Sequence, residues 1–164
     1  MRRAGQSCHL TAAIPPPSGP NCLVTEPSQP TISTNVSCTP GCTIAAHGHA
    51  SVHQGTDYQP IEGNNPLFAV MAGTITYGGS STALSGYTIT IRSGNLEFVY
   101  MHVAWDPKME QGGGFVDVGQ VIGEMGNSGQ HKDGTSYTKH LHFEIWDISG
   151  GGRKRLPPGD IGLQ

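Results

Sequence analysis

The chain has 164 residues, of which 24 are Gly and 12 are Pro, and only 13% are charged. This length fits one domain with trailing segments, and the glycine content argues against a helical bundle or coiled coil. The net charge of −3 gives no sign of a nucleic-acid partner, and no run approaches the roughly eighteen apolar residues of a membrane span. Eight histidines stand out among so few charged side chains.

Residues 1–43 hold most of the prolines and all four cysteines, and we predict an irregular Pro/Cys-rich arm. One interpretation is that disulfides cross-link this arm, and four cysteines can form two disulfides in three ways. The alternative is a zinc knuckle that combines the Cys38-x-x-x-Cys42 pair with Cys8 and either His9 or Cys22. The arm lacks a second closely spaced cysteine pair, so we favour disulfides. Disulfides indicate an oxidising setting outside the cytoplasm.

The start of the chain carries two arginines but lacks the apolar core of a secretory signal. The apolar stretch at 10–14 is short, whereas a signal needs about 7–15 apolar residues. We therefore expect no cleaved signal. The protein is expected to act outside the cytoplasm, either on a phage virion or as a secreted or periplasmic protein exported by another route.

From about residue 44 the sequence changes to short strand-like segments with β-branched residues and frequent glycine turns. The turn at 93–95 joins two of these segments into a predicted hairpin. Nothing from 44 to 150 carries a long helical stripe. We predict an all-β domain over 44–150, a small antiparallel sheet core with long loops, followed by a short tail over 151–164. The extended segments are 66–73, 74–79, 87–92, 96–102, 115–118, 120–125 and 141–146.

His140 and His142 open the last predicted strand. Because side chains alternate along a strand, both imidazoles share one face with Glu144, while the apolar residues between them share the other face and can enter a core. Two neighbouring imidazoles suit convergence on one metal ion. They also suit an ordinary pair of surface histidines, since His-x-His often occurs without metal.

His53 and Asp57 lie four residues apart with Gly55 between them, so a tight loop would let both chelate one cation. The plainer interpretation is a loop carboxylate that caps a turn beside a solvated histidine. His102 ends a predicted strand, where a lone histidine is more often structural. The three pieces in this order along the chain are less expected by chance than any one of them.

In this order the sequence resembles the lysostaphin/LytM-type zinc endopeptidases, which cut the peptide cross-links of bacterial cell walls. The matching segments are 53–58, 66–75, 100–103, 118–123 with 126–129, and 140–145. By that resemblance His53, Asp57 and His142 would hold Zn2+, and His102 and His140 would be the catalytic pair. The resemblance implies that these residues line a zinc cleft between the long loops.

Elementary chemistry supports this division of roles. Three protein ligands leave a fourth zinc position for water, and the ion lowers the pKa of that water and polarises the scissile carbonyl. His140, two residues from a ligand on the same face, is placed to take the water proton. His102 could hold the developing oxyanion or protonate the leaving amine, and the sequence leaves open which histidine does which.

Two features depart from the family pattern. Ten residues, 130–139, separate Gly129 from His140, more than family members usually have, and Lys139 stands where a proline is usual. We expect a longer loop beside the site, which affects substrate preference rather than metal binding. The arm of residues 1–43 has no counterpart in the family core.

The resemblance implies a zinc metalloendopeptidase that hydrolyses peptide bonds in the stem peptides or cross-bridges of bacterial peptidoglycan, and we lean towards a phage virion-associated wall hydrolase. The expected partners are peptidoglycan and, through residues 1–43, other phage tail or secretion-machine proteins. The alternative is a non-catalytic wall-binding or structural component of a phage tail or exported machine that keeps a structural zinc. Only the first hypothesis predicts wall digestion that is lost in His140→Ala.

Overall fold

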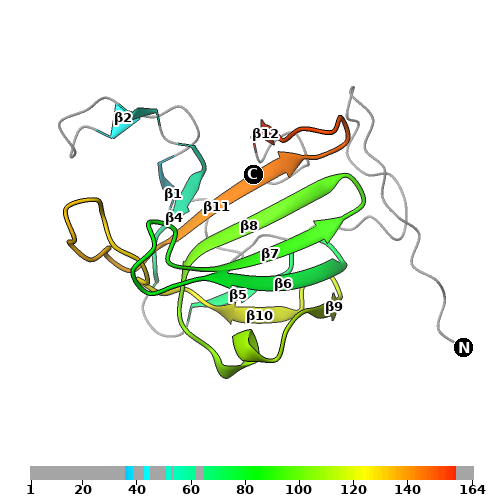
Figure 1. Cartoon of the computed structure of the whole chain (residues 1–164), viewed down its shortest axis with the longest axis horizontal. Coiled ribbons are helices and arrows are strands. Elements are labelled where there is room, and N and C mark those ends of the chain that lie inside the picture. The colour runs from blue at the N-terminus through cyan, green and yellow to red at the C-terminus, as the bar shows by residue number, and fades with distance from the viewer. Residues whose placement is uncertain (1–35, 39–42, 45–50, 53, 62–64, 158–164) are drawn as a thin grey trace, which may run out of the picture.

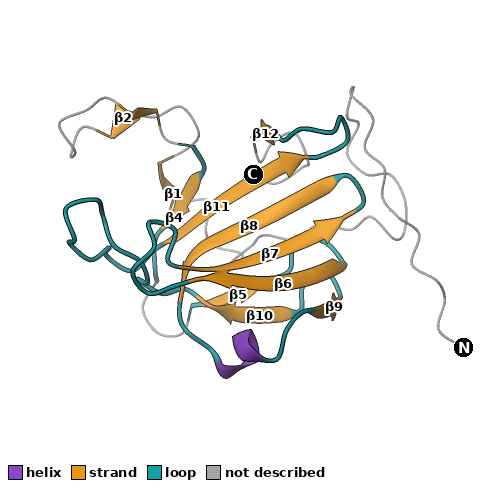
Figure 2. Ribbon diagram, viewed as in Figure 1, coloured by secondary structure: helices purple, strands orange, loops and turns teal. Residues whose placement is uncertain are grey.

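The computed structural model describes residues 36–38, 43–44, 51–52, 54–61 and 65–157. Within these ranges the chain is almost entirely strand and loop, with one helical turn, η3 (Pro107–Glu110), as Figure 2 shows. The all-β fold class predicted from the sequence is therefore confirmed. In the same ranges, no helix has the length and apolar character needed to cross a membrane.

A single antiparallel sheet dominates the described part of the chain (Figure 1). Its strand order is β1 (Val36–Cys38), β4 (Thr56–Tyr58), β11 (Leu141–Asp147), β8 (Leu96–Val103), β7 (Tyr87–Ser93), β6 (Gly73–Gly79) and β9 (Gly114–Val116), and β12 (Lys154–Leu156) also pairs with β11. Two small two-stranded sheets accompany it. They pair β5 (Pro66–Phe68) with β10 (Val121–Glu124), and β2 (Thr43–Ile44) with β3 (Ser51–Val52).

Strand β11 is the centre of the arrangement because it has three partners. β8 pairs along one edge, over residues 142–147. On the other edge β4 pairs with residues 141–143 and β12 pairs with residues 145–147. β4 and β12 therefore lie end to end along the same edge of β11, as Figure 1 also shows. Part of the segment predicted as a tail is thus a strand of the main sheet.

The hairpin predicted from alternation is confirmed as β7 and β8. Its strands pair from Arg92 opposite Glu97 towards the far end of the sheet. The turn consists of Gly94 and Asn95, which separate the paired residues Ser93 and Leu96. Gly94 has φ +57, a left-handed conformation that a tight two-residue hairpin turn requires and that glycine adopts without strain.

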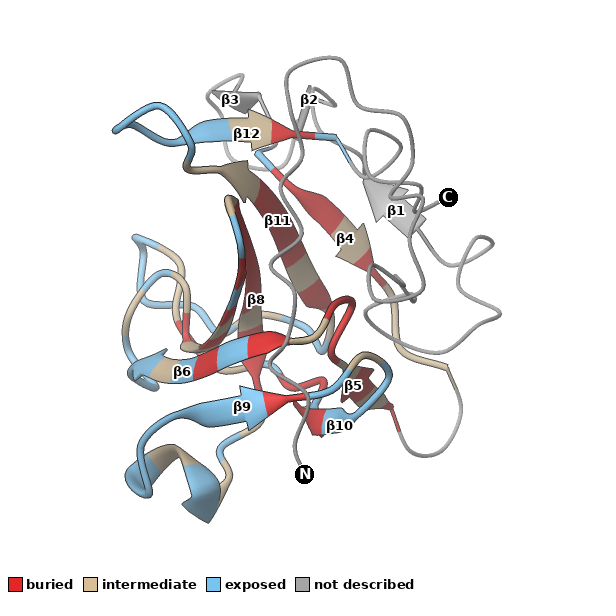
Figure 3. Cartoon of the chain, turned by 90° about the vertical axis from the view of Figure 1, so that its right-hand side faces the viewer, coloured by how far each residue is buried: buried red, intermediate tan, exposed pale blue. Residues whose placement is uncertain are grey.

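The hydrophobic core lies against one face of the main sheet. Leu141, Phe143 and Ile145 of β11 are at most 1% exposed, as their spacing in the sequence predicts. The Phe143 ring lies 6.4 Å from the Phe98 ring and 5.0 Å from the Tyr100 ring, measured between centroids. Burying one such phenyl ring contributes about 1.5–3 kcal/mol. Figure 3 shows buried residues along β8 and β11, so β11 is held firmly from its core side.

The β5–β10 pair and the loop after β5 cover this core. Leu67 and Val70 are fully buried there. The Tyr100 hydroxyl crosses from the main sheet, donates to the Phe68 carbonyl at 2.8 Å and accepts from the Val70 N–H at 3.1 Å. These two hydrogen bonds satisfy a buried polar group, which would otherwise be costly, and they join the two layers.

One expectation of local structure is wrong, and another lies outside the described residues. Asp57 does not lie in a tight loop, because Thr56–Tyr58 forms strand β4 and pairs with β11. Hydrogen bonding to β11 satisfies the backbone there, which a loop would leave to solvent. The predicted disulfides involve Cys8, Cys22 and Cys42, which lie outside the described residues, so the pairing of the cysteines stays a prediction.

Candidate active site

Two of the predicted metal ligands face each other across neighbouring strands. Asp57 of β4 and His142 of β11 are direct cross-strand partners, and adjacent side chains on one face of a sheet are close enough to interact. The His142 Nδ1 atom lies 2.9 Å from the Asp57 Oδ1 atom, and both side chains are mostly buried. The third predicted ligand, His53, lies outside the described residues.

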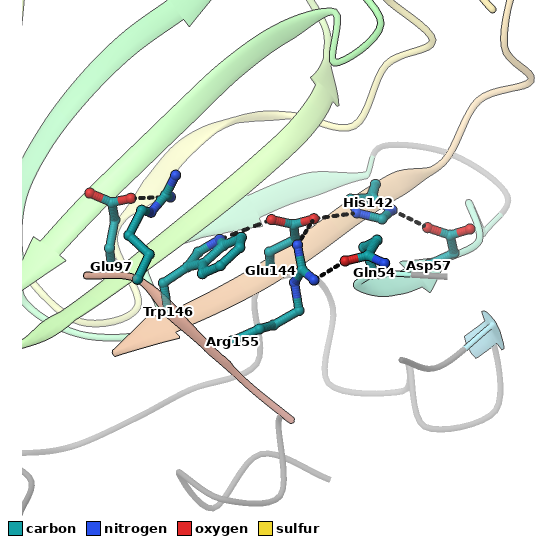
Figure 4. A network of polar contacts seen from close by, with 8 residues as sticks. Gln54, Asp57, Glu97, His142, Glu144, Trp146 and Arg155 are labelled. Atoms are coloured by element: carbon teal, nitrogen blue, oxygen red, sulfur yellow. Dashed lines mark hydrogen bonds and ion pairs between the residues drawn. The ribbon is translucent and has the colours of Figure 1, made fainter. Parts of the chain in front are cut away.

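A second carboxylate holds the other side of the His142 ring. Its Nε2 atom lies 3.2 Å from Oε1 of Glu144, a residue only 7% exposed (Figure 4). Burial alone lowers the pKa of His142, but the hydrogen bonds and negative charges of Asp57 and Glu144 outweigh it and raise the pKa to about 9. Without a bound metal ion, His142 is therefore an imidazolium at neutral pH and donates from both nitrogens.

Gly55 allows the chain to pass directly against this imidazole. A Cβ atom at Gly55 would lie 2.6 Å from His142 Nε2 and 2.6 Å from the Phe143 carbonyl oxygen, closer than real contacts allow. Glycine between His53 and Asp57 is thus a packing requirement, because any side chain there would displace the ring. This explains the residue at the centre of the His53–Asp57 motif.

The donor set suits zinc. An imidazole nitrogen and a carboxylate oxygen that point at one another are two of the ligand types that Zn2+ binds in proteins. The described residues alone contain no group of three or more His, Cys, Asp or Glu side chains placed to hold a metal. Asp57 and His142 therefore form two thirds of the predicted ligand set, and His53 would complete it.

His102 reaches the site through an irregularity in β8. The pairing with β7 shifts between Tyr100 and Val103, so β8 contains an extra residue, and His102 has φ +60. Regular alternation would put His102 on the core face with Tyr100, and a β-bulge re-aims the side chain. A non-glycine residue in this conformation costs of order 1–3 kcal/mol and is typical of functional sites. The backbone N–H of His102 donates to the Ser85 carbonyl at 3.0 Å.

The environment of His102 keeps its imidazole neutral. The residue is 5% exposed, and its Nδ1 atom lies 2.9 Å from the Ser128 carbonyl oxygen. Burial lowers the pKa of His102 to about 4, aided by the nearby His140 and His142 rings and opposed by the Ser128 hydrogen bond. A neutral ring beside a carbonyl must donate from Nδ1, so Nε2 carries the lone pair.

His140, the second residue predicted to be catalytic, lies next to His102. It precedes β11 and stands two residues before His142, and its Nδ1 atom lies 2.7 Å from the Thr138 carbonyl oxygen. The ring centroids of His102 and His140 are 4.5 Å apart, and those of His102 and His142 are 6.3 Å apart. His102 of β8, His140 just before β11 and His142 of β11 thus lie together, and His142 contacts Asp57.

The long segment before His140 folds back over this group. A turn closes between His131 and Thr135, whose backbone atoms form a 2.9 Å hydrogen bond. The Tyr137 ring then lies 4.1 Å from the His102 ring and 3.9 Å from the His131 ring, measured between centroids. The longer loop that the sequence predicts beside the site therefore contacts the candidate catalytic pair through Tyr137.

The sequence did not predict the roles of several residues around the site. Ser128 acts through a backbone carbonyl, which has no side-chain signature, although its segment was part of the family resemblance. Gln54 and Arg155 bond to one another and Arg155 also bonds to Glu144, but Arg155 sits in a basic run that resembled a tail. Strand alternation placed Glu144 on the histidine face and gave no reason to expect its partners.

Comparison with known proteins identifies the family. Residues 51–155 match peptidase family M23, which is well over half of the chain. The chain belongs to this family. The M23 match includes all five residues predicted as metal ligands or catalytic residues, from His53 to His142. No protein with a curated description matches the chain.

Solved M23 structures share the fold. The catalytic domain of the antimicrobial peptidase lysostaphin from Staphylococcus simulans is 26% identical, with a TM-score of 0.56 over 76% of this chain and 88% of that one. A point mutant of the catalytic domain of the prophage-encoded M23 protein EnpA from Enterococcus faecalis is 26% identical, with a TM-score of 0.56 over 77% and 90%. The lytM structure from Ruminococcus gnavus is 27% identical, with a TM-score of 0.52 over 66% of this chain. The chain spans only 45% of that lytM structure and 47% of a larger lysostaphin structure.

Proposed function

We propose that this protein is a zinc-dependent endopeptidase that hydrolyses peptide bonds in the stem peptides or cross-bridges of bacterial peptidoglycan. The observation that carries the proposal is the juxtaposition of two unlike pairs. Asp57 and His142 face each other at 2.9 Å, and the His102 and His140 rings lie 4.5 Å apart beside them. Membership of peptidase family M23 and the similarity to lysostaphin support the same activity.

In this proposal His53, Asp57 and His142 hold the zinc. The bound ion supplies Lewis acidity towards the scissile carbonyl and lowers the pKa of water. Asp57 and His142 prepare the position, because Asp57 Oδ1 and His142 Nδ1 already face each other at 2.9 Å. His142 must release its Nδ1 proton when it becomes a ligand, because a metal-bound imidazole nitrogen carries no proton.

His102 and His140 move protons in this scheme. Each directs Nδ1 at a backbone carbonyl, that of Ser128 or Thr138, so each imidazole that donates there presents Nε2 as an acceptor. Such a ring takes a proton from the attacking water first and returns it to the leaving amine afterwards. The contact between the two rings places a second imidazole within reach of the developing charge.

The decisive experiment is mass spectrometry of fragments released from purified peptidoglycan sacculi. Fragments that appear with the zinc-loaded protein, disappear with a chelator and return with added zinc support the proposal and identify the bond cleaved. His140→Ala should release none, while His131→Ala, which removes a histidine ring 3.9 Å from the Tyr137 ring, serves as the matched control. Cleavage by a zinc-free preparation would overturn the proposal.

The same experiment tests the non-catalytic alternative. A wall-binding or structural component would bind sacculi without cleaving them, and binding would survive in His102→Ala and His140→Ala.

We propose that the enzyme acts outside the cytoplasm as a virion-associated hydrolase, with residues 1–43 in contact with phage tail or secretion-machine proteins. The similarity to the prophage-encoded EnpA domain supports this setting, and detection of the chain in purified particles would test it.

A further inference from the structure

A network of polar contacts runs along β11 from the candidate metal ligands to β12 (Figure 4). Glu144 lies at its centre. The Oε1 atom of Glu144 is 3.2 Å from His142 Nε2 and accepts from Nη2 of Arg155 at 3.3 Å, and its Oε2 atom accepts from the Trp146 indole N–H at 2.9 Å. Both carboxylate oxygens are therefore engaged, and the orientation of this buried group is fixed.

Arg155 connects this carboxylate to the other ligand-bearing segment. Its guanidinium donates to Gln54 Oε1 as well as to Glu144, and it stacks on the Trp146 ring, with 4.2 Å between the guanidinium carbon and the ring centroid. Gln54 stands directly after His53 and three residues before Asp57. Arg155 of β12 thus connects the segment that carries His53 and Asp57 with strand β11, which carries His142.

The strand pairing makes this bridge possible. β12 follows β4 along the same edge of β11, with Arg155 directly opposite Trp146. The planar fork of arginine suits two acceptors at once and an aromatic face beneath it, which lysine cannot match. The bridge therefore depends on the identity of residue 155 and on its place in the sheet.

We propose that Arg155 and Trp146 are positioning residues that act through Glu144 to fix the metal-binding geometry. Glu144 holds the Nε2 side of the His142 ring so that Nδ1 faces Asp57 and the proposed metal position, and Arg155 fixes Gln54, which directly follows His53 in the sequence. This inference rests on the proposed function, because it assumes that the ion is bound at this site. Groups that hold the far side of a ligating histidine typically change metal affinity about 10- to 100-fold when they are replaced.

Arg153 provides a matched control within the same strand region. It lies two residues before Arg155 and also stacks on Trp146, at 4.3 Å from the ring centroid, but its ion pair is with Glu97. Glu97 is a buried carboxylate on β8 that also pairs with Arg92. Replacing Arg153 therefore removes an arginine, a ring contact and a buried ion pair without removing a contact to Glu144.

The test measures the zinc affinity of the full chain by competition with a chromophoric chelator, together with thermal unfolding of the zinc-free protein. We expect Glu144→Gln and Arg155→Met to weaken zinc binding by about 10- to 100-fold, and Trp146→Phe, which keeps a ring but loses the indole N–H, to weaken it less. Arg153→Met should destabilise the fold and leave zinc affinity within about twofold of the wild type. The Glu144→Gln and Arg155→Met effects should be less than additive in the double variant, because they act through one contact.

The outcomes separate this inference from the proposed function. Failure of the wild-type chain to bind zinc stoichiometrically would overturn the proposed function itself. Normal zinc binding by the wild type with unchanged affinity in Arg155→Met and Trp146→Phe would overturn the inference alone. Those two variants carry the test if Glu144→Gln does not fold, and equal losses in Arg153→Met and Arg155→Met would show a general effect of stability and also overturn it.

Discussion

His142 and His102 lie on neighbouring strands, both largely buried, yet their protonation states are opposite. Burial lowers the pKa of each ring, but His142 lies between two carboxylates that raise its pKa to about 9, whereas His102 contacts a backbone carbonyl and has a pKa of about 4. Burial acts in the same direction on both rings, so the difference in pKa comes from the presence or absence of carboxylate partners. Two carboxylates outweigh burial at His142, whereas at His102 a single carbonyl offsets burial only in part, and burial keeps that ring neutral.

The strongest test of this contrast removes one partner of the cation-binding pair. We expect Asp57→Asn and His142→Ala to lose bound zinc and all measurable cleavage of peptidoglycan, because each removes one of three predicted ligands. Metal analysis after dialysis and fragment release from sacculi measure the two effects. If both variants keep zinc near one per chain, the metal binds elsewhere and the assignment of Asp57 and His142 as ligands is wrong.

The His102–His140 pair should respond differently. We expect His140→Ala and His102→Asn to keep zinc near one per chain while cleavage falls by about 10²–10⁴-fold, the usual contribution of general acid–base catalysis. Asparagine is chosen for residue 102 because it tolerates the positive φ at that position better than most side chains do. If either variant loses its zinc together with its activity, the separation of the two pairs is wrong.

If His102 is held neutral, the free energy of unfolding should fall at acidic pH. Its pKa is lowered to about 4 in the folded chain from about 6.5 when unfolded, so between these values only the unfolded chain binds this proton. Stability is then lost as pH falls, by on the order of 3 kcal/mol between about pH 6.5 and 4. Urea unfolding of zinc-free protein measures it, and the wild type should lose more than His102→Asn. Identical acid dependence in both proteins would show that His102 is not held neutral.

Alkali should reveal the opposite behaviour of His142. Its folded pKa of about 9 lies above the unfolded value, so its contribution to stability is present below about pH 6.5 and disappears as pH rises through 9. We expect this loss in zinc-free protein and a weaker dependence in Asp57→Asn. Saturating zinc should remove the loss, since the metal replaces the proton. Thermal unfolding across this range, with and without zinc, checks the direction.

The sequence predicted the elements that depend on local patterns. The alternation of apolar and polar residues identified the β7–β8 hairpin. It also assigned the two faces of β11 correctly, with Leu141 and Phe143 in the core and His142 on the other face. It could not predict β12 or the strand character of Asp57, because both depend on pairing with β11 from distant parts of the chain.

The candidate site shows the same limit. The order of the histidine motifs and the family resemblance pointed to His102 and His140, and the structure brings their rings together. The β-bulge that turns His102, the Ser128 carbonyl that fixes its tautomer and the arginine of β12 left no local pattern, because each arises from tertiary contacts. The sequence therefore predicted that these histidines lie together, but it did not predict the environment that sets their charge and orientation.

The end-to-end placement of β4 and β12 has a consequence for folding. The contact between Gln54 and Arg155 joins residues 101 positions apart, and closing so long a loop delays a contact relative to local hairpins. The β7–β8 hairpin should form early, and the ion-binding geometry should mature only when β12 docks. A nascent chain in which β12 has not yet been synthesised would lack the contacts of Arg155 with Gln54 and Glu144. Tight metal binding would then be delayed until synthesis has passed residue 155.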